Sequence, residues 1–247
     1  MRNVALVVLA VLVAAGCGAA PQKRYFTLSY PLMSDRVTES RPPLHPVKMR
    51  IKPFRVSLPY DRPQMVYRQS PFEFNYDPYR LWASKPQQML RELVEEHLVA
   101  ARLMGEVTRD FGDQSPAYEL GAEVLAIEEY DAGDAWYGHL AMRFDLIRFS
   151  DQRVLWHYEF DRKGRVHEQR QVYIVRALSE ILRDEMKVVT AELDRIISQD
   201  RGVPVTLSMP APAQDNPSAA TAPVTPAPAR SPASTDELIV PDEGGTR

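Results

Sequence analysis

The most constraining feature of this 247-residue chain is a run of three alternating segments followed by one long amphipathic segment. Tyr118–Asp131, His139–Phe149 and Arg153–Arg162 each carry apolar side chains at every second position, as expected for strands with one buried face. The connections between them are short and polar, so the three strands should form an antiparallel meander. Residues 172–199 repeat apolar side chains at helical spacing, which predicts a helix covering this sheet.

The first half of the chain predicts three more strands and a helix. Val47–Val56 alternates between apolar and basic residues, and two shorter strands are expected on either side of Pro71. A helix is expected to begin near Pro86, with Ser84 as its N-cap and Gly105 soon after its end. The order β-β-β-α-β-β-β-α predicts an α/β (α+β) fold. It is a two-layer sandwich with a mixed, largely antiparallel sheet and two helices on one face.

The uncovered face of this sheet is expected to be charged. It carries Arg143, Asp145, His157 and Glu159, which alternate with the buried side chains of their strands. These residues can meet either solvent or a second copy of the chain, so a homo-oligomer is one arrangement that the pattern allows.

The N-terminus carries an export signal that ends at the only cysteine of the chain. A basic residue precedes an apolar run, Val4–Ala15, that is short for a membrane span. A single cysteine excludes an intramolecular disulfide. A catalytic thiol would need a partner held near it by a fold, and Cys17 lies ahead of any expected folded segment. The junction resembles a bacterial lipobox, with Ala14 where leucine is usual, and this implies that Cys17 is the lipid attachment site.

The lipobox resemblance also implies a compartment and a division of the chain. In such lipoproteins an aspartate after the cysteine often marks inner-membrane retention, so Gly18 favours the outer membrane of a Gram-negative bacterium, facing the periplasm. We expect a signal peptide at 1–16, a lipidated N-terminus and tether at 17–45, one folded domain at 46–202, and a disordered Pro/Ala-rich tail at 203–247.

No arrangement of residues in the sequence indicates catalysis or metal binding. Motifs for phosphate, zinc or serine-nucleophile chemistry are absent, and the five histidines have no helical pairing. His97 is expected to be a hydrogen-bonded, half-buried residue, and Glu128-Glu129 a solvated strand end rather than an acid–base pair. The net charge of −3 gives no reason to expect nucleic acid as a partner. We therefore expect no enzyme activity, no cofactor and no metal.

Aromatic and arginine residues are concentrated in the segment from Tyr60 to Leu90. These residue types are typical of protein contacts, although they can equally fill a core. The string "RPQMVYR", followed by Tyr79 and by Trp82-Ala83 before a helix and preceded by a lipobox, resembles the ABC-type transport auxiliary lipoproteins of the PqiC type. The resemblance spans roughly residues 25–200.

The resemblance implies a non-enzymatic lipoprotein that works with an MCE-domain protein and an inner-membrane ABC transporter to move lipids between membranes. The candidate partner contacts are Tyr67, Arg68, Arg80 and Trp82. One alternative is a lipoprotein adaptor in outer-membrane biogenesis or peptidoglycan-synthase activation. Another is a lipid carrier, which would require a deep apolar cavity.

Overall fold

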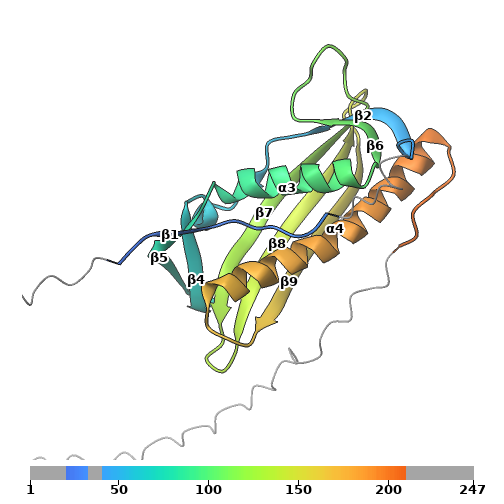
Figure 1. Cartoon of the computed structure of the whole chain (residues 1–247). Coiled ribbons are helices and arrows are strands. Elements are labelled where there is room, and N and C mark those ends of the chain that lie inside the picture. Colours follow the sequence, from blue (N-terminus) through green and yellow to red (C-terminus); the bar gives the residue numbers. More distant parts are fainter. Residues whose placement is uncertain (1–20, 33–40, 210–247) are drawn as a thin grey trace, which may run out of the picture. The chain divides into compact units, whose positions relative to one another are not determined.

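The computed structural model describes residues 21–32 and 41–209. The expected signal peptide, Cys17, Gly18 and residues 210–247 of the expected tail lie outside this part. Within it, two α-helices lie on the same face of a nine-stranded sheet (Figure 1). No helix in the described ranges is long and apolar enough to cross a membrane. The expected α/β sandwich is confirmed.

Along the described part of the chain, five strands precede the first α-helix, one short strand leads into the long meander, and the second α-helix comes last. The strands are β1 (Arg24–Phe26), β2 (His45–Ile51), β3 (Arg55–Val56), β4 (Gln64–Ser70), β5 (Glu73–Trp82), β6 (Met104–Thr108), β7 (Tyr118–Asp131), β8 (Trp136–Arg148) and β9 (Val154–Val166). The helices are the 3-10 turn η1 (Leu58–Tyr60), α3 (Pro86–Ala100) and α4 (Gln171–Arg201).

Strand β7 organises the sheet because it has a different kind of neighbour on each edge. On one edge it pairs with β8 in antiparallel register along its length, and β8 pairs with β9 in the same way. On the other edge β2, β3 and β4 follow one another, all parallel to β7. Beyond them, β6 extends β2, while β5 and then β1 extend β4. The predicted meander is confirmed.

The core lies between the sheet and the two helices. Alternate residues of β7 and β8 that point toward the helices are fully buried, such as Leu120, Val124 and Phe144. Helix α4 lies close to the meander because two paired glycines, Gly138 and Gly164, face it. A β-carbon at Gly138 would lie 3.0 Å from a backbone oxygen of α4. Both helices are buried on this side through their apolar stripes, as their spacing predicts.

Short elements differ from the sequence-based expectations. The expected strand Val47–Val56 is interrupted around Pro53, which has no N–H to donate, and so forms β2 and β3. Strand β6 was not predicted. Gly105 follows the end of α3 by five residues, as expected, and lies inside this strand. The prediction of Ser84 as N-cap is wrong: Lys85 occupies that position, without a side-chain hydrogen bond.

The folded unit extends past both expected domain limits. Strand β1 pairs with β5, and Leu28 and Tyr30 are buried in the same core. After α4, the backbone amides of Thr206 and Leu207 donate to Asp194 Oδ2 at 2.8 and 2.7 Å. Both flanking segments therefore belong to the domain, although neither has a strong periodicity of its own.

Candidate functional site

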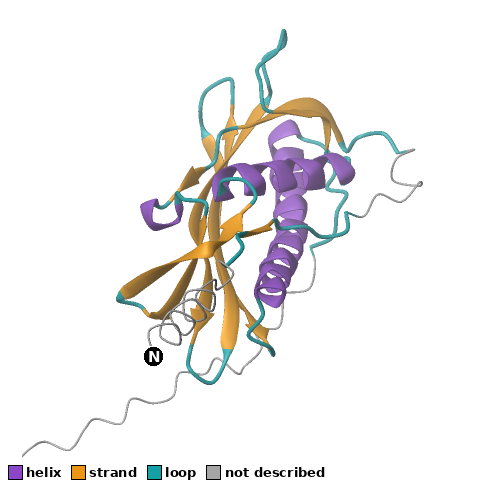
Figure 2. Ribbon diagram, turned by 60° about the vertical axis from the view of Figure 1, so that its left-hand side comes forward, coloured by secondary structure: helices purple, strands orange, loops and turns teal. Residues whose placement is uncertain are grey.

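The arginine- and aromatic-rich segment forms the β4–β5 hairpin, which pairs with the C-terminal end of β7. Figure 2 shows this hairpin standing apart from the long strands. Its arginines lie over aromatic rings of the same hairpin, which favours a fixed geometry. The pairs are Arg62 with Tyr76 at 3.7 Å, Arg68 with Phe74 at 4.8 Å and Arg80 with Tyr67 at 5.9 Å from the ring centroid.

The four candidate contact residues occupy different environments in this hairpin. Trp82 is 2% exposed and belongs to the core. The side chain of Arg68 is 16% exposed and that of Arg80 is 33% exposed. Tyr67 is half-buried. Only Tyr67 and Arg80 thus offer part of their side chains to a partner, while Arg68 and Trp82 hold the hairpin against the sheet.

Glu128 is the centre of a buried polar network on one face of the sheet. Its carboxylate, which is fully buried, accepts hydrogen bonds from Tyr60 Oη at 2.6 Å and Arg68 Nη2 at 2.5 Å. His139 Nδ1 lies 2.7 Å from the same carboxylate, and its Nε2 lies 2.8 Å from Asp161. The network joins η1, β4, β7, β8 and β9, which are far apart in the sequence.

The electrostatics of this network favour a permanently charged Glu128. Burial alone would raise the pKa of Glu128, but hydrogen bonds from His139, Arg68 and Tyr60 outweigh it and hold the pKa below its ordinary value. Burial and the bond to Glu128 raise the pKa of Tyr60. The carboxylate is saturated with donors, so the arrangement is suited to fixing the hairpin rather than to proton transfer.

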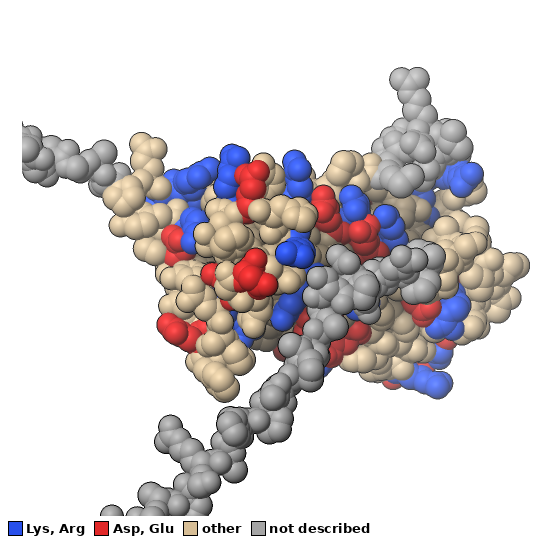
Figure 3. Space-filling view, turned by 90° about the horizontal axis from the view of Figure 1, so that it is seen from below, with Lys and Arg blue, Asp and Glu red and all other residues tan. Residues whose placement is uncertain are grey.

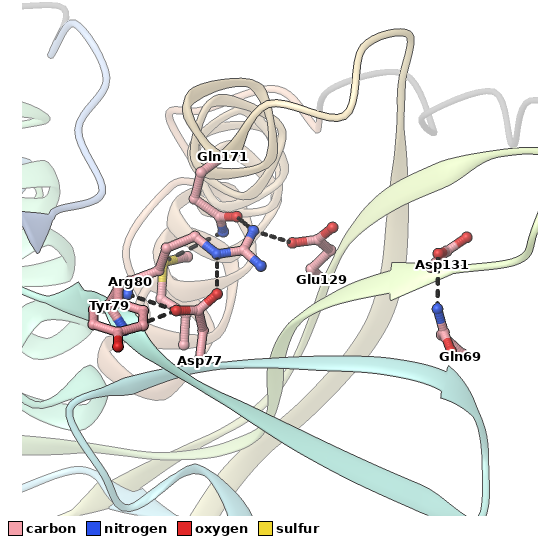
Figure 4. Close-up of polar contacts among 8 residues, drawn as sticks. Gln69, Asp77, Tyr79, Arg80, Glu129, Asp131 and Gln171 are labelled. Carbon is pink, nitrogen blue, oxygen red and sulfur yellow. Dashed lines mark hydrogen bonds and ion pairs between the residues drawn. The ribbon is translucent and has the colours of Figure 1, made fainter. Parts of the chain in front are cut away.

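Glu129 lies on the opposite face of the same strand and bonds to Arg80. The distance from Arg80 Nη1 to Glu129 Oε2 is 3.2 Å, and Arg80 also donates to Asp77 and to Gln171 (Figure 4). Gln171 is the first residue of α4, and its Nε2 lies 3.3 Å from Met65 Sδ. Burial raises the pKa of Glu129, and Arg80 opposes this shift. Arg80 therefore connects β5, β7 and α4.

Both members of the Glu128-Glu129 pair are buried, so the prediction of a solvated strand end is wrong. The alternation of a strand sends adjacent residues to opposite faces, and here each side chain is buried by partners on its own face. The partners of the pair come from distant parts of the chain. The only local sign that Glu128 and Glu129 could be buried was their position inside a predicted strand with buried residues.

His45 and His97 also have structural partners. His45 Nε2 lies 2.8 Å from Asp194 Oδ1 in the core, and burial is the main cause that lowers the pKa of His45. His97 Nδ1 lies 3.1 Å from Tyr30 Oη, which confirms the hydrogen-bonded, half-buried role predicted for His97. No three His, Cys, Asp or Glu residues within 21–32 and 41–209 are arranged to hold a metal ion.

The uncovered sheet face carries a row of ion pairs. Arg55, Glu123, Arg143 and Glu159 are in register on β3, β7, β8 and β9, so charges of opposite sign alternate across four strands. The distances are 3.0 Å for the first pair, 3.8 Å for the second and 2.9 Å for the third. Acidic and basic side chains are likewise interspersed on the face drawn in Figure 3.

A hollow of about 310 Å³ lies between the end of β9 and the first turns of α4. Its lining includes Arg165, Glu168, Arg176 and Glu180 together with the ring of Tyr173. Four of its eight lining residues are charged, so it differs from the deep apolar cavity that a lipid carrier would need.

Comparisons with known proteins agree with this architecture. A protein of the DUF330 family from Xanthomonas campestris, XCC0632, superposes with a TM-score of 0.59 at 18% identity, covering 72% of this chain and 98% of that one. A second, uncharacterized protein gives a TM-score of 0.55 at 17% identity, covering 70% and 99%. At these identities the likeness shows the fold alone. A comparison with curated proteins finds no match.

A family model described as "ABC-type transport auxiliary lipoprotein component" matches residues 26–187. The match begins in β1 and ends inside α4, so it covers the sheet, the β4–β5 hairpin and both glutamates of β7. This chain therefore belongs to the family of ABC-type transport auxiliary lipoprotein components.

Proposed function

We propose that this protein is the outer-membrane-anchored lipoprotein of an MCE-type ABC lipid transport system, where it acts as a docking adaptor on the periplasmic side. The observation that carries this proposal is the family match over residues 26–187, which identifies an auxiliary component of ABC-type transport. The MCE-domain partner and the role in lipid movement are inferred from the resemblance of the "RPQMVYR" segment.

The anchor in this proposal is acylation of Cys17, which follows a signal-peptide pattern. Each buried CH₂ group contributes about 0.8 kcal/mol, so two or more acyl chains make membrane attachment effectively permanent. Gly18 supports the outer membrane as the destination.

The docking surface in this proposal is the β4–β5 hairpin. Tyr67 and Arg80 present part of their side chains on it, and both residue types are enriched at protein contacts. Arg68 and Trp82 keep the hairpin rigid through Glu128 and the core. The carboxylate of Glu128 is occupied by three hydrogen-bond partners, and we propose no catalytic step.

The anchor is tested by membrane fractionation of Cys17→Ser and Gly18→Asp variants in the native envelope. The Cys17→Ser chain should lose its acyl chains in mass spectrometry and leave the outer-membrane fraction. The Gly18→Asp chain should stay acylated and shift to the inner membrane. A Cys17→Ser chain that still fractionates with the outer membrane would contradict lipid anchoring.

The partner is tested by photo-cross-linking in intact cells. A photoreactive phenylalanine analogue at Tyr67 should capture an MCE-domain protein. The same analogue at Val154, which is 55% exposed at the opposite end of the meander, should not. Capture of an outer-membrane assembly factor or a peptidoglycan synthase at Tyr67 would instead support the envelope-adaptor alternative.

A further inference from the structure

The tip of the β4–β5 hairpin exposes a phenylalanine that contributes nothing to the fold. Phe72 is 93% exposed, in the two-residue turn between the paired Ser70 and Glu73. Turns of this length favour glycine, asparagine or aspartate, so a large apolar ring here does not serve the turn itself. Contact of this ring with a partner outside the described domain would remove apolar surface from water, which is favourable.

The register of β1 shows from which side the N-terminal chain enters. β1 runs parallel to β5, with Arg24 opposite Arg80. The chain before Arg24 therefore approaches from the side of β5 that leads to the hairpin tip. Cys17 precedes Arg24 by seven residues, and Glu73 precedes Arg80 by the same number. An extended chain spans at most about 3.6 Å per residue, so either branch reaches about 25 Å.

These two upper bounds allow the hairpin tip and Cys17 to meet the same membrane. Covalent geometry confines the α-carbon of Cys17 to about 25 Å from that of Arg24, and the tip lies at most that far from Arg80 along β5. A membrane that holds Cys17 is thus accessible to the hairpin tip. Val154 comes just after the β8–β9 turn and pairs with Ile147, close to the C-terminal end of β8. It therefore lies at the end of the meander that is opposite to Trp136 and to the hairpin.

Several exposed side chains along this edge are of the kinds that a membrane interface accepts, although the exposed Glu73 at the tip is not one of them. Tyr25 is 64% exposed, Tyr76 36% and Tyr79 43%, and Arg24 is also exposed. Tyrosine rings with a polar tip and long basic side chains favour the headgroup layer, while a phenylalanine can enter the acyl boundary below it. This combination fits a phospholipid surface better than the dry centre of a protein interface.

We propose that the β4–β5 hairpin tip inserts Phe72 into the same leaflet that holds the acyl chains of Cys17. This rests on the proposed lipid anchor, and it adds a second, non-covalent contact that orients the domain on the membrane. The anchor keeps the tip at high local concentration near the bilayer, so the hairpin needs little affinity of its own. The β8–β9 turn then faces the periplasm.

The chain offers a direct test because it has one cysteine. An acylated Cys17 has no free thiol, so full-length Phe72→Cys and Val154→Cys variants can each be labelled at one position with an environment-sensitive fluorophore. The labelled proteins are reconstituted into phosphatidylethanolamine/phosphatidylglycerol vesicles with and without brominated phospholipid. The label at Phe72→Cys should lose fluorescence in brominated vesicles, and the label at Val154→Cys should not.

The possible results separate this inference from the anchor itself. Equal fluorescence losses at the two positions would overturn the tip contact. So would a label at Phe72→Cys that is shielded from aqueous iodide but not quenched by brominated lipid, because its partner would then be protein. A parent chain that itself takes up one thiol label would refute acylation of Cys17, and with it this orientation. A parent chain that takes up none leaves the anchor intact whatever the tip does.

Discussion

At the residue scale, the network around Glu128 shows how the β4–β5 hairpin is fixed. Arg68 and Tyr60 come from segments sixty or more residues before Glu128, and His139 from the next strand. A buried charge is tolerated only when its partners are complete. The local sequence indicates neither the burial nor the partners, because both depend on which strands pair with β7.

Replacing Glu128 should therefore cost far more stability than replacing a partly exposed glutamate of the same strand. Glu128→Ala leaves Arg68 and His139 without their shared acceptor, which should lower the free energy of unfolding by about 3–5 kcal/mol. Glu123→Ala removes only surface ion pairs and should cost at most about 1 kcal/mol. Urea titrations of both variants measure the difference, and similar midpoints would contradict the proposed network.

The pH dependence of stability should contain a contribution from His97. Burial lowers the pKa of His97 to about 4, and the nearby Lys187 also lowers it. In the unfolded chain the pKa returns to about 6.5. Between pH 4 and 6.5 the unfolded chain binds more protons than the folded chain at this position. The contribution of neutral His97 to the free energy of unfolding is therefore complete above pH 6.5 and is lost as the pH falls toward 4.

A His97→Gln variant should thus show a shallower fall in unfolding free energy from pH 6.5 to 4 than the parent chain. Urea titrations at several pH values provide the measurement, and His167→Gln, at an exposed position, is the control. Parallel pH profiles for parent and His97→Gln would show that His97 does not titrate as its burial requires.

At the element scale, the close approach of α4 to the meander depends on the two small positions that face it. Gly138 and Gly164 are paired on β8 and β9, beneath Ala177 of the helix. The long elements were predictable because each repeats its period several times. The separate strands β3 and β6 could not be predicted, because they are too short to show a period. β3 has two residues and follows Pro53, and β6 has five residues and contains Gly105.

Adding one methyl group at Gly138 should push α4 away from the sheet. The new β-carbon would lie 3.0 Å from the carbonyl oxygen of Ile174, so Gly138→Ala should destabilise the fold by about 1–3 kcal/mol through overpacking. Gly121→Ala is the matched control, since its β-carbon would meet only Lys52 at 3.9 Å. The midpoint temperature of thermal unfolding should fall for Gly138→Ala and should stay unchanged or rise slightly for Gly121→Ala.

At the scale of the whole molecule, the layers follow from periodicity but the edges of the sheet do not. The apolar faces of β7, β8 and β9 require a helical layer, and α3 and α4 supply it. The parallel pairing of β2, β3 and β4 with β7 leaves no local mark in the sequence. The flanking segments likewise depend on distant partners: β1 pairs with β5, and the residues after α4 bond to Asp194.

Truncation should reveal where the folded domain ends. A chain ending at Met209 keeps both backbone amides that bond to Asp194 and should unfold at the same temperature as the parent. A chain ending at Arg201 leaves this fully buried carboxylate short of donors and should lose about 1–3 kcal/mol of stability. Identical melting temperatures for both truncations would place the end of the domain at α4.

One edge of β7 is shared by β2, β3 and β4, and this arrangement also has a kinetic consequence. Residues of β2, β3 and β4 meet partners on β7 that are made more than sixty residues later in the chain. Contacts of such long sequence separation form slowly, because the loop between them must close first. The N-terminal half therefore lacks its sheet partner until β7 has emerged. Export through a secretion channel, which the proposed lipid anchor requires, would therefore carry an open chain that folds only when most of its length has arrived on the far side.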